Sequence, residues 1–301
     1  MSTGNMSFSV GRAKVTGVYE LDTGRFPFSL LMLGFDETRY KTKGHLLPPG
    51  YDASTDFSLR VQNWLIQVDG RRIMIDTGFG NDKIFPGAPP EFSHLKTPFL
   101  NNLAAAGARP EEIDLVLSTH LHIDHVGWNT RWDGEKWVPT FPNARYIFTE
   151  IDRNYWDPSR PDYNPSGRTI AQNVFEQSVQ PILDAGLADT VEPDARIDEL
   201  FQFVPTPGHT PGQIAVKLTC DGEGAIFCGD AIHHPVQILF PEWSTAFCED
   251  PVMAAHSRRR LLDIIADENL ILTPAHFAHQ ACRIERRGSE FLPINVDVKA
   301  D

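Results

Sequence analysis

The amino-acid sequence predicts an α/β protein in which two β-sheets pack against each other and are covered by helices. Three observations support this fold class. Short apolar runs of strand type alternate with helix-compatible stretches in both halves of the chain. Two Asp-Gly dipeptides join neighbouring strand runs, as expected for tight hairpins. Histidine and aspartate residues follow the ends of several predicted strands, where two packed layers can bring them together.

In the first half of the chain, a predicted hairpin precedes alternating helices and strands. Its strands cover residues 61–68 and 72–75 and are joined by Asp69-Gly70. Apolar periodicity predicts helices over residues 97–106 and 169–185, and strands over residues 113–117 and 145–149. Gly107 and Gly186 directly follow the two helices, as helix-ending glycines do. The strand at 113–117 leads into a histidine-rich segment, so we expect it to position that segment.

The second half repeats the pattern. Strands are predicted over residues 200–204, 213–219, 225–228 and 271–272, and Asp221-Gly222 provides a second hairpin turn. Asp250 and Pro251 predict the start of a helix that runs towards Asp267, because aspartate caps free N–H groups and proline suits the first helical position. The Pro-Thr-Pro-Gly segment at 205–208 is stiff, so we expect His209 to lie in a rigid loop.

The 301 residues are expected to form one catalytic domain with an N-terminal extension. Residues 57–301 contain the repeating pattern, whereas residues 1–56 precede it and are shorter than an ordinary domain of about 100 residues. We expect the extension to pack on the core or at a subunit interface. Its apolar side chains would either cover the site or contact a second subunit of a homodimer; they are Phe26, Phe28, Leu31 and Met32.

Composition and charge restrict the partners. Hydrophobic residues make up 41% and charged residues 22% of the chain, as in ordinary globular proteins. The net charge of −13 disfavours a nucleic-acid substrate and favours a small neutral or apolar one. Residues 1–9 lack the apolar core of a signal peptide, and the run at 30–33 is too short to cross a membrane. We therefore expect a cytoplasmic protein without membrane association.

Two further features are interpreted as structural. Four cysteines lack the C-x-x-C spacing of metal sites and are expected to be reduced core thiols; they are Cys220, Cys228, Cys248 and Cys282. Arg258, Arg259 and Arg260 are consecutive positions of a predicted helix and cannot form one stripe, so we expect them to lie on a solvated face.

The segment from Ser118 to His125 has the residue types and spacing of a metal site. His120 and His122 are two residues apart on an extended segment, so their side chains point the same way and can bind one ion. Asp124 and His125 follow where the chain turns and can reach a second ion. Solvated loop residues or core histidines are the alternative for any single position, but four ligand-type residues within six positions favour metal binding.

Several short motifs together resemble those of a known family. They are His-x-His-x-Asp-His at 120–125, Ile-Asp-Thr-Gly at 75–78, Pro-Gly-His-Thr at 207–210, Gly-Asp at 229–230 and Pro-Ala-His at 274–276. Over about residues 57–285, the chain resembles the metallo-β-lactamase superfamily. The resemblance implies an αββα sandwich of two mixed β-sheets flanked by helices.

The resemblance also implies a site with two metal ions, most simply Zn²⁺. Its implied ligands are His120, His122 and His209 for the first metal, Asp124, His125 and His276 for the second, and Asp230 as the bridge. Asp76 matches a position where a carboxylate orients ligands, and a hairpin-end cap is its alternative role. Metals of this kind lower the pKa of a shared water, which gives a bridging hydroxide as nucleophile.

Lactone opening or carboxylic ester cleavage suits such a nucleophile, because the metals also stabilise the tetrahedral oxyanion. Asp124 or Asp230 could pass a proton to the leaving alkoxide. The run from Gly229 to His234 is similar to the N-acyl-homoserine lactonase branch, which has a tyrosine where this chain has His233. We expect His233 to donate to the carbonyl oxygen or to help protonate the leaving group, and His234 to have a packing or supporting role. The organisation also resembles the methyl parathion hydrolase branch.

Other activities of the same fold stay open, namely hydrolysis of β-lactams, thioesters or phosphotriesters. An iron-dependent oxidoreductase is less favoured, because the diiron branch has glutamate at the position of His122. A purely structural metal is disfavoured by the absence of cysteine from the motifs. Aromatic residues near the motifs either form an apolar substrate wall or pack beneath loops; they are Trp128, Trp132, Trp137, Trp156, Phe240, Trp243 and Phe247.

Overall fold

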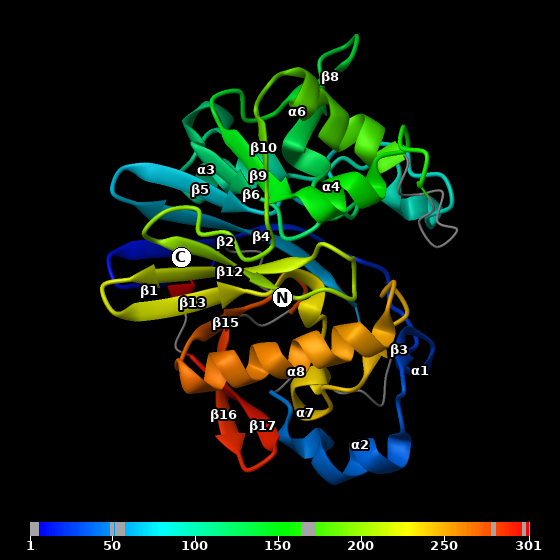
Figure 1. Ribbon diagram of the computed structural model, residues 1–301, viewed down its shortest axis with the longest axis vertical. Coiled ribbons are helices and arrows are strands. Elements are labelled where there is room, and N and C mark those ends of the chain that lie inside the picture. The colour runs from blue at the N-terminus through cyan, green and yellow to red at the C-terminus, as the bar shows by residue number, and fades with distance from the viewer. Residues whose placement is uncertain are drawn as a thin grey trace.

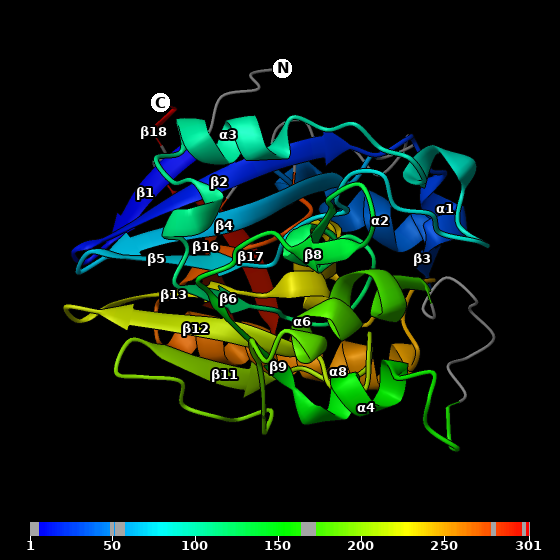
Figure 2. The ribbon, with the colours of Figure 1, turned by 90° about the horizontal axis from the view of Figure 1, so that it is seen from above.

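Two mixed β-sheets pack face to face, with helices on both outer sides (Figures 1 and 2). The computed structural model describes residues 6–48, 51, 58–163, 173–277, 281–296 and 299–300. The layering confirms the predicted αββα sandwich. In Figure 1, α3, α4 and α6 lie on the side of the larger sheet and α8 lies on the side of the smaller sheet.

Among the described residues, the larger sheet has eight strands in the order β10-β9-β6-β5-β4-β2-β1-β18. In chain order these are β1 (Met6–Val10), β2 (Ala13–Asp22), β4 (Arg60–Val68), β5 (Arg71–Ile75), β6 (Leu115–Leu117), β9 (Arg145–Thr149), β10 (Ala188–Val191) and β18 (Lys299–Ala300). The strands β5, β6 and β9 are parallel, and Leu117 pairs with both Ile75 and Ile147. Their carboxyl ends therefore meet at one edge, where Asp76, His120 and Asp152 follow.

The smaller sheet has six described strands in the order β11-β12-β13-β15-β16-β17. They are β11 (Phe201–Pro205), β12 (Ile214–Cys220), β13 (Glu223–Phe227), β15 (Ile271–Thr273), β16 (Cys282–Arg287) and β17 (Glu290–Asn295). Here β13 and β15 are the parallel pair, with Phe227 opposite Thr273. Asp230 and His276 follow these two strands, so this sheet also delivers its candidate ligands from neighbouring carboxyl ends.

Both predicted hairpins are present, and their turns explain the Asp-Gly dipeptides. Asp69 and Gly70 have φ of 52° and 77°, and Asp221 and Gly222 have φ of 52° and 81°. Positive φ at both central residues is the two-residue hairpin geometry that Asp-Gly favours. Arg12 links the two turns, because its guanidinium bonds to both Asp69 oxygens at 2.9 Å and also contacts the Asp221 carboxylate.

The longest helix, α8 (Pro251–Asp267), starts where the sequence predicts. The Asp250 side chain accepts hydrogen bonds from the N–H groups of Val252 and Met253 at 3.0 and 2.9 Å. The other helical segments are α1 (Phe28–Leu31), α2 (Glu37–Lys43), α3 (Phe99–Ala105), α4 (Glu150–Trp156), α6 (Gln180–Asp184) and α7 (Val236–Leu239), with the π-helix η5 (Phe175–Val179). Short 3₁₀ turns are η1 (Gly44–Leu46), η2 (Pro90–Phe92), η3 (Pro110–Glu112), η4 (Gly127–Asn129) and η6 (Gly229–Ala231).

The predicted helix at 169–185 differs from a regular α-helix. Its first residues, 169–172, lie outside the described residues, and a π-helical turn interrupts the remainder at 175–179. Pro181 lacks the N–H that would bond to the carbonyl of Gln177. That carbonyl instead accepts from Lys83 Nζ at 3.3 Å and from the Thr130 hydroxyl, so the irregular turn is satisfied by side chains.

Three apolar clusters fill the layers. The cluster between the sheets takes side chains from both of them, including Trp64, Ile66, Leu117, Phe203, Val216 and Phe227. A second cluster joins the larger sheet to α3, η5 and α6, and a third joins the smaller sheet to α8. Within the part of the chain that the structure describes, no helix has both the length and the apolarity needed to cross a bilayer.

The N-terminal region contributes to both layers. Its strands β1 and β2 lie within the larger sheet, and β2 pairs along β4 from Lys14 opposite Gln67 to Asp22 opposite Arg60. Further on, β3 (Met32–Leu33) pairs with β14 (Ser244–Thr245), beside a cluster that includes Phe28, Tyr40, Phe240 and Trp243. The expected domain boundary at residues 56 and 57 lies outside the described residues.

The expectation of a solvated arginine face is wrong for Arg258. This side chain is fully buried, and its guanidinium donates to the carbonyls of Ala231, Pro241 and Trp243 at 2.7, 2.6 and 3.0 Å. Burial lowers the pKa of Arg258 to about 10, so it stays charged at neutral pH. The segment from 231 to 243 turns its carbonyls inward and therefore needs a buried donor. The neighbouring Arg259 and Arg260 are exposed, as expected.

Candidate metal centre

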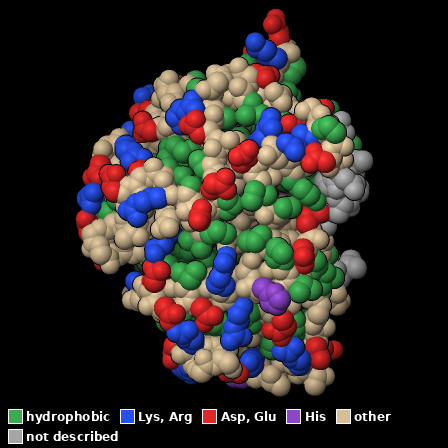
Figure 3. Space-filling model, viewed as in Figure 1, with side chains coloured by type: hydrophobic (Ala, Val, Ile, Leu, Met, Phe, Trp, Pro, Cys, Tyr) green, Lys and Arg blue, Asp and Glu red, His purple; other side chains and the backbone are tan. Residues whose placement is uncertain are grey.

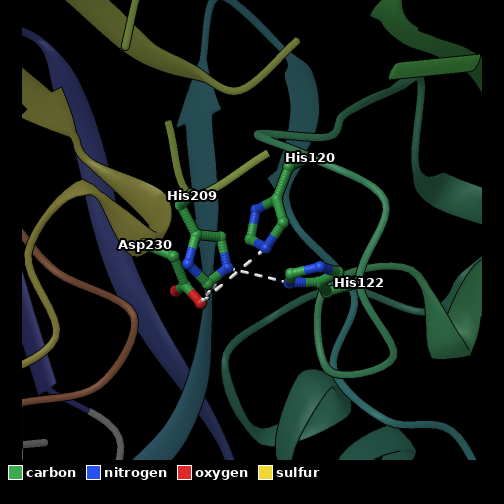
Figure 4. A group of neighbouring side chains, drawn as sticks. All are labelled: His120, His122, His209 and Asp230. Atoms are coloured by element: carbon green, nitrogen blue, oxygen red, sulfur yellow. Dashed lines mark hydrogen bonds and ion pairs between the residues drawn. The ribbon is translucent and has the colours of Figure 1, made fainter. Parts of the chain in front are cut away.

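Four candidate ligands converge where the ends of β6, β11 and β13 approach one another. Their ligand atoms lie within 4.8 Å of one another; they belong to His120, His122, His209 and Asp230. His209 Nε2 is 2.8 Å from His122 Nδ1 and 3.1 Å from Asp230 Oδ2. His120 Nε2 is 3.7 Å from the same carboxylate oxygen. Figure 4 shows the three rings and the carboxylate pointing toward one another, so this group could hold a metal ion.

A second group lies on the other side of Asp230. It contains Asp124, His125 and His276, whose ligand atoms also lie within 4.8 Å of one another. The remaining oxygen of Asp230, Oδ1, is 3.1 Å from His125 Nε2 and 2.8 Å from His276 Nε2. The two oxygens of one carboxylate therefore face two different groups, which is the arrangement that a bridging ligand requires.

The burial and charge of these groups fit divalent cations. Within the described structure, three of their buried atoms make no hydrogen bond of regular geometry and lie close only to other atoms of this site: His120 Nε2, His125 Nε2 and Asp230 Oδ1. Burial lowers the pKa of His209 to about 4 and that of His120 well below its usual range, which leaves neutral nitrogens. Although burial opposes ionisation of Asp230, His276 and His125 hold its pKa well below the usual range. His120 and His209 are thus neutral nitrogen ligands of the kind that zinc takes. Burial opposes protonation of His125 and His276, but Asp230 raises their pKa, so a metal ion in the second group would displace their protons.

Asp76 supports one histidine of each group. It follows β5 in a left-handed conformation, with φ of 58°. Its Oδ2 accepts the Nδ1–H of His125 at 2.8 Å and the hydroxyl of Thr119 at 2.8 Å. The Thr119 oxygen in turn lies 3.1 Å from His120 Nδ1 and can accept its N–H. The structure therefore favours the orienting role of Asp76, because these contacts leave both Nε2 atoms to face the site.

Five of the seven candidate ligands line one wall of a pocket that holds about 820 Å³ of space, part of it open to solvent; they are His122, Asp124, His209, Asp230 and His276. The remaining wall is largely apolar and includes Phe26, Leu59, Phe79, Phe92, Trp156, Val174 and Phe247. No lysine or arginine is among the described residues that line it.

A family model for the metallo-beta-lactamase superfamily matches residues 59–276, which is more than two thirds of the chain. The chain belongs to this superfamily. The matched region begins next to β4 and ends at His276, so it contains every candidate ligand described above. The predicted class of metal-dependent hydrolase is confirmed at this level.

Curated members of the superfamily are similar over most of their length. A probable metallo-hydrolase of Mycobacterium tuberculosis is 27% identical over 224 residues, which cover 70% of this chain and 69% of the relative. An N-acyl homoserine lactonase of Bacillus thuringiensis is 23% identical over 239 residues, which cover 75% of this chain and 86% of the relative.

Solved structures of the superfamily share the fold. The hydrolase AbOPH superposes with a TM-score of 0.80 at 23% identity and covers 99% of both chains. AidC, described as a dizinc quorum-quenching lactonase in complex with a product, superposes with a TM-score of 0.76 at 20% identity and covers 98% of both chains. These likenesses confirm the metallo-β-lactamase fold along almost the whole chain, including the N-terminal region.

His233, the predicted catalytic histidine, also lies in this superfamily site. It lines the pocket, and its Nε2 is 3.1 Å from Asp230 Oδ2. Its ring stacks on that of His276, with centroids 5.6 Å apart and an interplanar angle of 11°. Burial lowers the pKa of His233, so the ring is neutral. His234 instead packs edge-on against Phe28 and Tyr51 at 5.3 Å, which agrees with its expected packing role.

Some of the aromatic residues singled out in the sequence line the pocket, and others pack away from it. Trp156 and Phe247 line the pocket, and so does Phe26 of the N-terminal region. Trp128 packs on Phe99 with ring centroids 5.3 Å apart, and it does not line the pocket. Phe240 stacks on Trp243 at 4.1 Å in the cluster beneath the N-terminal region. Trp132 and Trp137 belong to the hairpin of β7 (Thr130–Trp132) and β8 (Trp137–Pro139).

Sequence reasoning missed a buried aspartate that ties the histidine loops together. Asp152, at the start of α4, accepts from Leu121 N–H at 3.2 Å, the Thr210 hydroxyl at 2.9 Å and Gly212 N–H at 2.7 Å. Burial raises the pKa of Asp152 to about 6. The only sequence signal is the spacing Thr149-x-x-Asp152, which predicts a helix start and not this role.

Glu20 was missed in the same way. This buried residue of β2 accepts from the N–H groups of Phe79 and Gly80 at 2.7 and 3.2 Å and from Trp128 Nε1 at 2.7 Å. Burial raises its pKa to about 7. Because Phe79 lines the pocket, Glu20 fixes part of the pocket wall from behind.

Proposed function

We propose that this protein is a dinuclear metal-dependent hydrolase that opens a lactone or cleaves a carboxylic ester with apolar substituents. The observation that carries the proposal is the position of Asp230. Its two carboxylate oxygens face two separate groups of candidate ligands, at the wall of a largely apolar pocket.

In this proposal, His120, His122 and His209 hold one ion, Asp124, His125 and His276 hold the other, and Asp230 contacts both. Two divalent ions bound there would activate water as a nucleophile near neutral pH and polarise the carbonyl of the substrate. Zinc is the proposed metal, because the donors are nitrogen and oxygen atoms and a relative in the superfamily is described as a dizinc lactonase.

Two other groups of the chain are placed to move or hold a proton. The Asp124 side chain is 18% exposed, against 5% for Asp230, and it lines the pocket. We assign protonation of the leaving alkoxide to Asp124, because it is the more accessible carboxyl group. We assign hydrogen-bond donation to the substrate carbonyl to His233, because this ring lines the pocket beside Asp230.

The pocket favours a neutral, apolar substrate. Without a cationic side chain among its described lining residues, it offers no ion-pair partner to the carboxylates of β-lactams or of glutathione thioesters. The face shown in Figure 3 carries basic and acidic side chains interspersed with hydrophobic ones, so it provides no continuous basic surface for nucleic acid. The N-acyl homoserine lactonases among the relatives support a lactone as the first substrate to test.

The deciding experiment is a hydrolysis screen with zinc-loaded protein over acyl lactones, aryl esters, β-lactams, thioesters and phosphotriesters. We expect turnover of lactones and esters, loss of turnover after chelation, and recovery with two equivalents of zinc. Intact lactones and esters beside cleaved thioesters, lactams or phosphotriesters would overturn the substrate assignment. Iron in the purified protein together with redox turnover would overturn the proposed reaction class.

A further inference from the structure

The histidines of the candidate metal centre differ in what holds the far side of each ring. His125 Nδ1 contacts the Asp76 carboxylate at 2.8 Å, and His276 Nδ1 contacts the carbonyl of Arg60 at 2.8 Å. His209 Nδ1 instead faces a thiol, Cys248 Sγ, at 3.7 Å. When Nε2 binds a metal ion, as proposed above, His209 carries its proton on Nδ1 and the sulfur is the acceptor.

The backbone fixes the position of this thiol. The N–H groups of Glu249 and Asp250 donate to the carbonyls of His209 and Gly208 at 3.0 and 2.8 Å, so the residues after Cys248 are tied to the His209 loop. Gly208 has φ of 129°, and a Cβ there would lie 2.1 Å from the Ala254 nitrogen. The loop therefore lies directly against the first turn of α8, and the contact between thiol and imidazole follows from that packing.

The thiol also has a second partner that leads back to the site. Cys248 Sγ lies 3.6 Å from the hydroxyl of Thr245, and that hydroxyl lies 3.5 Å from His233 Nε2. Cys248 is 6% exposed and His209 is 1% exposed, so water does not replace these contacts. A chain of buried polar groups thus links His209 to His233 behind the ligands.

We propose that Cys248 is a positioning residue that accepts the Nδ1–H of His209 and thereby directs Nε2 toward the first group of ligands. This inference rests on the proposed metal assignment. A thiol is a weaker acceptor than the carboxylate and carbonyl behind His125 and His276. Because such outer contacts raise ligand basicity, the ion held by His120, His122 and His209 is the more easily lost of the two.

The test compares variants that keep or remove the acceptor at constant shape. Cys248→Val fills the space without an acceptor, Cys248→Ser keeps an acceptor, and Cys248→Ala serves where the valine variant does not fold. Cys220→Ala is the matched control, because Cys220 is also buried but ends β12 at the hairpin turn. Zinc affinities are measured by competition with a chromophoric chelator, and the cobalt-loaded proteins are compared by visible absorption.

We expect Cys248→Val to lower the affinity for one of two zinc ions by roughly 10- to 100-fold and to leave the other unchanged. Cys248→Ser and Cys220→Ala should bind both ions as the parent protein does, and only the valine or alanine variant should alter the cobalt spectrum. A purely structural role would lower the unfolding temperature without separating the two affinities.

Two results separate an error in the role of Cys248 from an error in the proposed two-metal site. If the parent protein binds two ions and Cys248→Val or Cys248→Ala binds both equally well, the role of Cys248 is wrong while the proposed function stands. If the parent protein binds no more than one ion, the dinuclear assignment itself is wrong.

Discussion

The loops that bring candidate ligands from the two sheets are held in opposite ways. Beside the larger sheet, three buried carboxylates accept backbone N–H groups: Glu20 from the loop after β5, Asp76 from Thr119, and Asp152 from the loops at 121 and 212. Beside the smaller sheet, the buried guanidinium of Arg258 donates to three carbonyls of the segment after Asp230.

The difference follows from which backbone groups each segment turns inward. A loop that presents N–H groups needs an acceptor, and a segment that presents carbonyls needs a donor. Burial raises the pKa of Glu20 to about 7 and that of Asp152 to about 6, whereas Arg258 stays charged at neutral pH. Only the loops beside the larger sheet should therefore change in stability with pH through these buried groups. The candidate metal centre lies where the loops held by buried carboxylates meet the segment held by Arg258, and Asp230 lies between them.

The largest effect is expected where the two regions meet. Replacing Asp230 with alanine removes a side chain that faces both groups, so kcat/KM should fall at least ~1,000-fold and zinc content should drop below two ions per chain. Asp157→Asn is the control, because Asp157 is also buried but its side chain bonds only to Ser159 and Arg153 among the described contacts. Two tightly bound ions in Asp230→Ala would contradict the shared role.

The second largest effect is expected from removing the buried guanidinium of Arg258, which should lower the stability of the fold. Arg258→Met keeps the length of the side chain but removes a donor from three buried carbonyls, of which that of Trp243 keeps a second donor in Gln237 Nε2. The free energy of unfolding should therefore fall by about 3 kcal/mol. The neighbouring Arg259→Met alters an exposed side chain and should change it by about 0.5 kcal/mol or less. Urea unfolding of the metal-free proteins at pH 7 measures both. If the two variants change the free energy of unfolding equally, the buried hydrogen bonds of Arg258 do not stabilise the fold.

The buried carboxyl group of Glu20 should make the stability of the protein depend on pH. The folded pKa of Glu20 is raised by burial to about 7 from an ordinary 4.5, so the folded state binds the extra proton between these values and loses stability as pH rises through them. Glu20→Gln cannot ionise. Its stability relative to the parent should therefore improve by roughly 2–3 kcal/mol from pH 4.5 to pH 7.

Urea unfolding across this pH range tests the expectation for Glu20. Glu111→Gln, at an exposed glutamate, should show a nearly constant difference from the parent. A flat difference for Glu20→Gln as well would mean that the buried carboxyl does not titrate in this range, and the contrast between the two regions would lose its pH signature.

The smallest expected effect concerns Asp76. Asp76→Asn keeps a residue type that tolerates the positive φ of 58° but removes the charge that His125 and Thr119 contact. Zinc affinity should fall roughly 10- to 100-fold, because outer partners of ligating histidines have effects of this size. The exposed Asp189→Asn provides a control measured by the same chelator competition. If zinc affinity is unchanged in Asp76→Asn, the charge of Asp76 is not needed to orient His125.

Local chemistry made much of the fold predictable. Asp-Gly turns with positive φ fix both hairpins, and the Asp250 carboxylate with Pro251 fixes the start of α8. The candidate ligands were also predictable, because each follows a short apolar strand and their residue types suit metal binding. Their spacing along the chain needs no knowledge of distant contacts.

The supports behind the site were not predictable, because their roles depend on distant partners. Arg258 has the same helical surroundings in sequence as Arg259, and only the approach of the segment after Asp230 buries it. Asp152 and Glu20 look like ordinary polar residues until the loops fold over them. The strand β2 was also missed; it pairs with its neighbour β1 across Gly11-Arg12 and with β4 more than thirty residues further on.

Arg12 connects the two sheets at the end away from the candidate metal centre. Its guanidinium bonds to Asp69 at the turn of one sheet and to Asp221 at the turn of the other, and its backbone N–H donates to the Asp221 carboxylate at 3.0 Å. Loops around the pocket lie at the opposite ends of the strands. A change in the length of those loops would therefore leave this connection, and the apolar cluster between the sheets, unaltered.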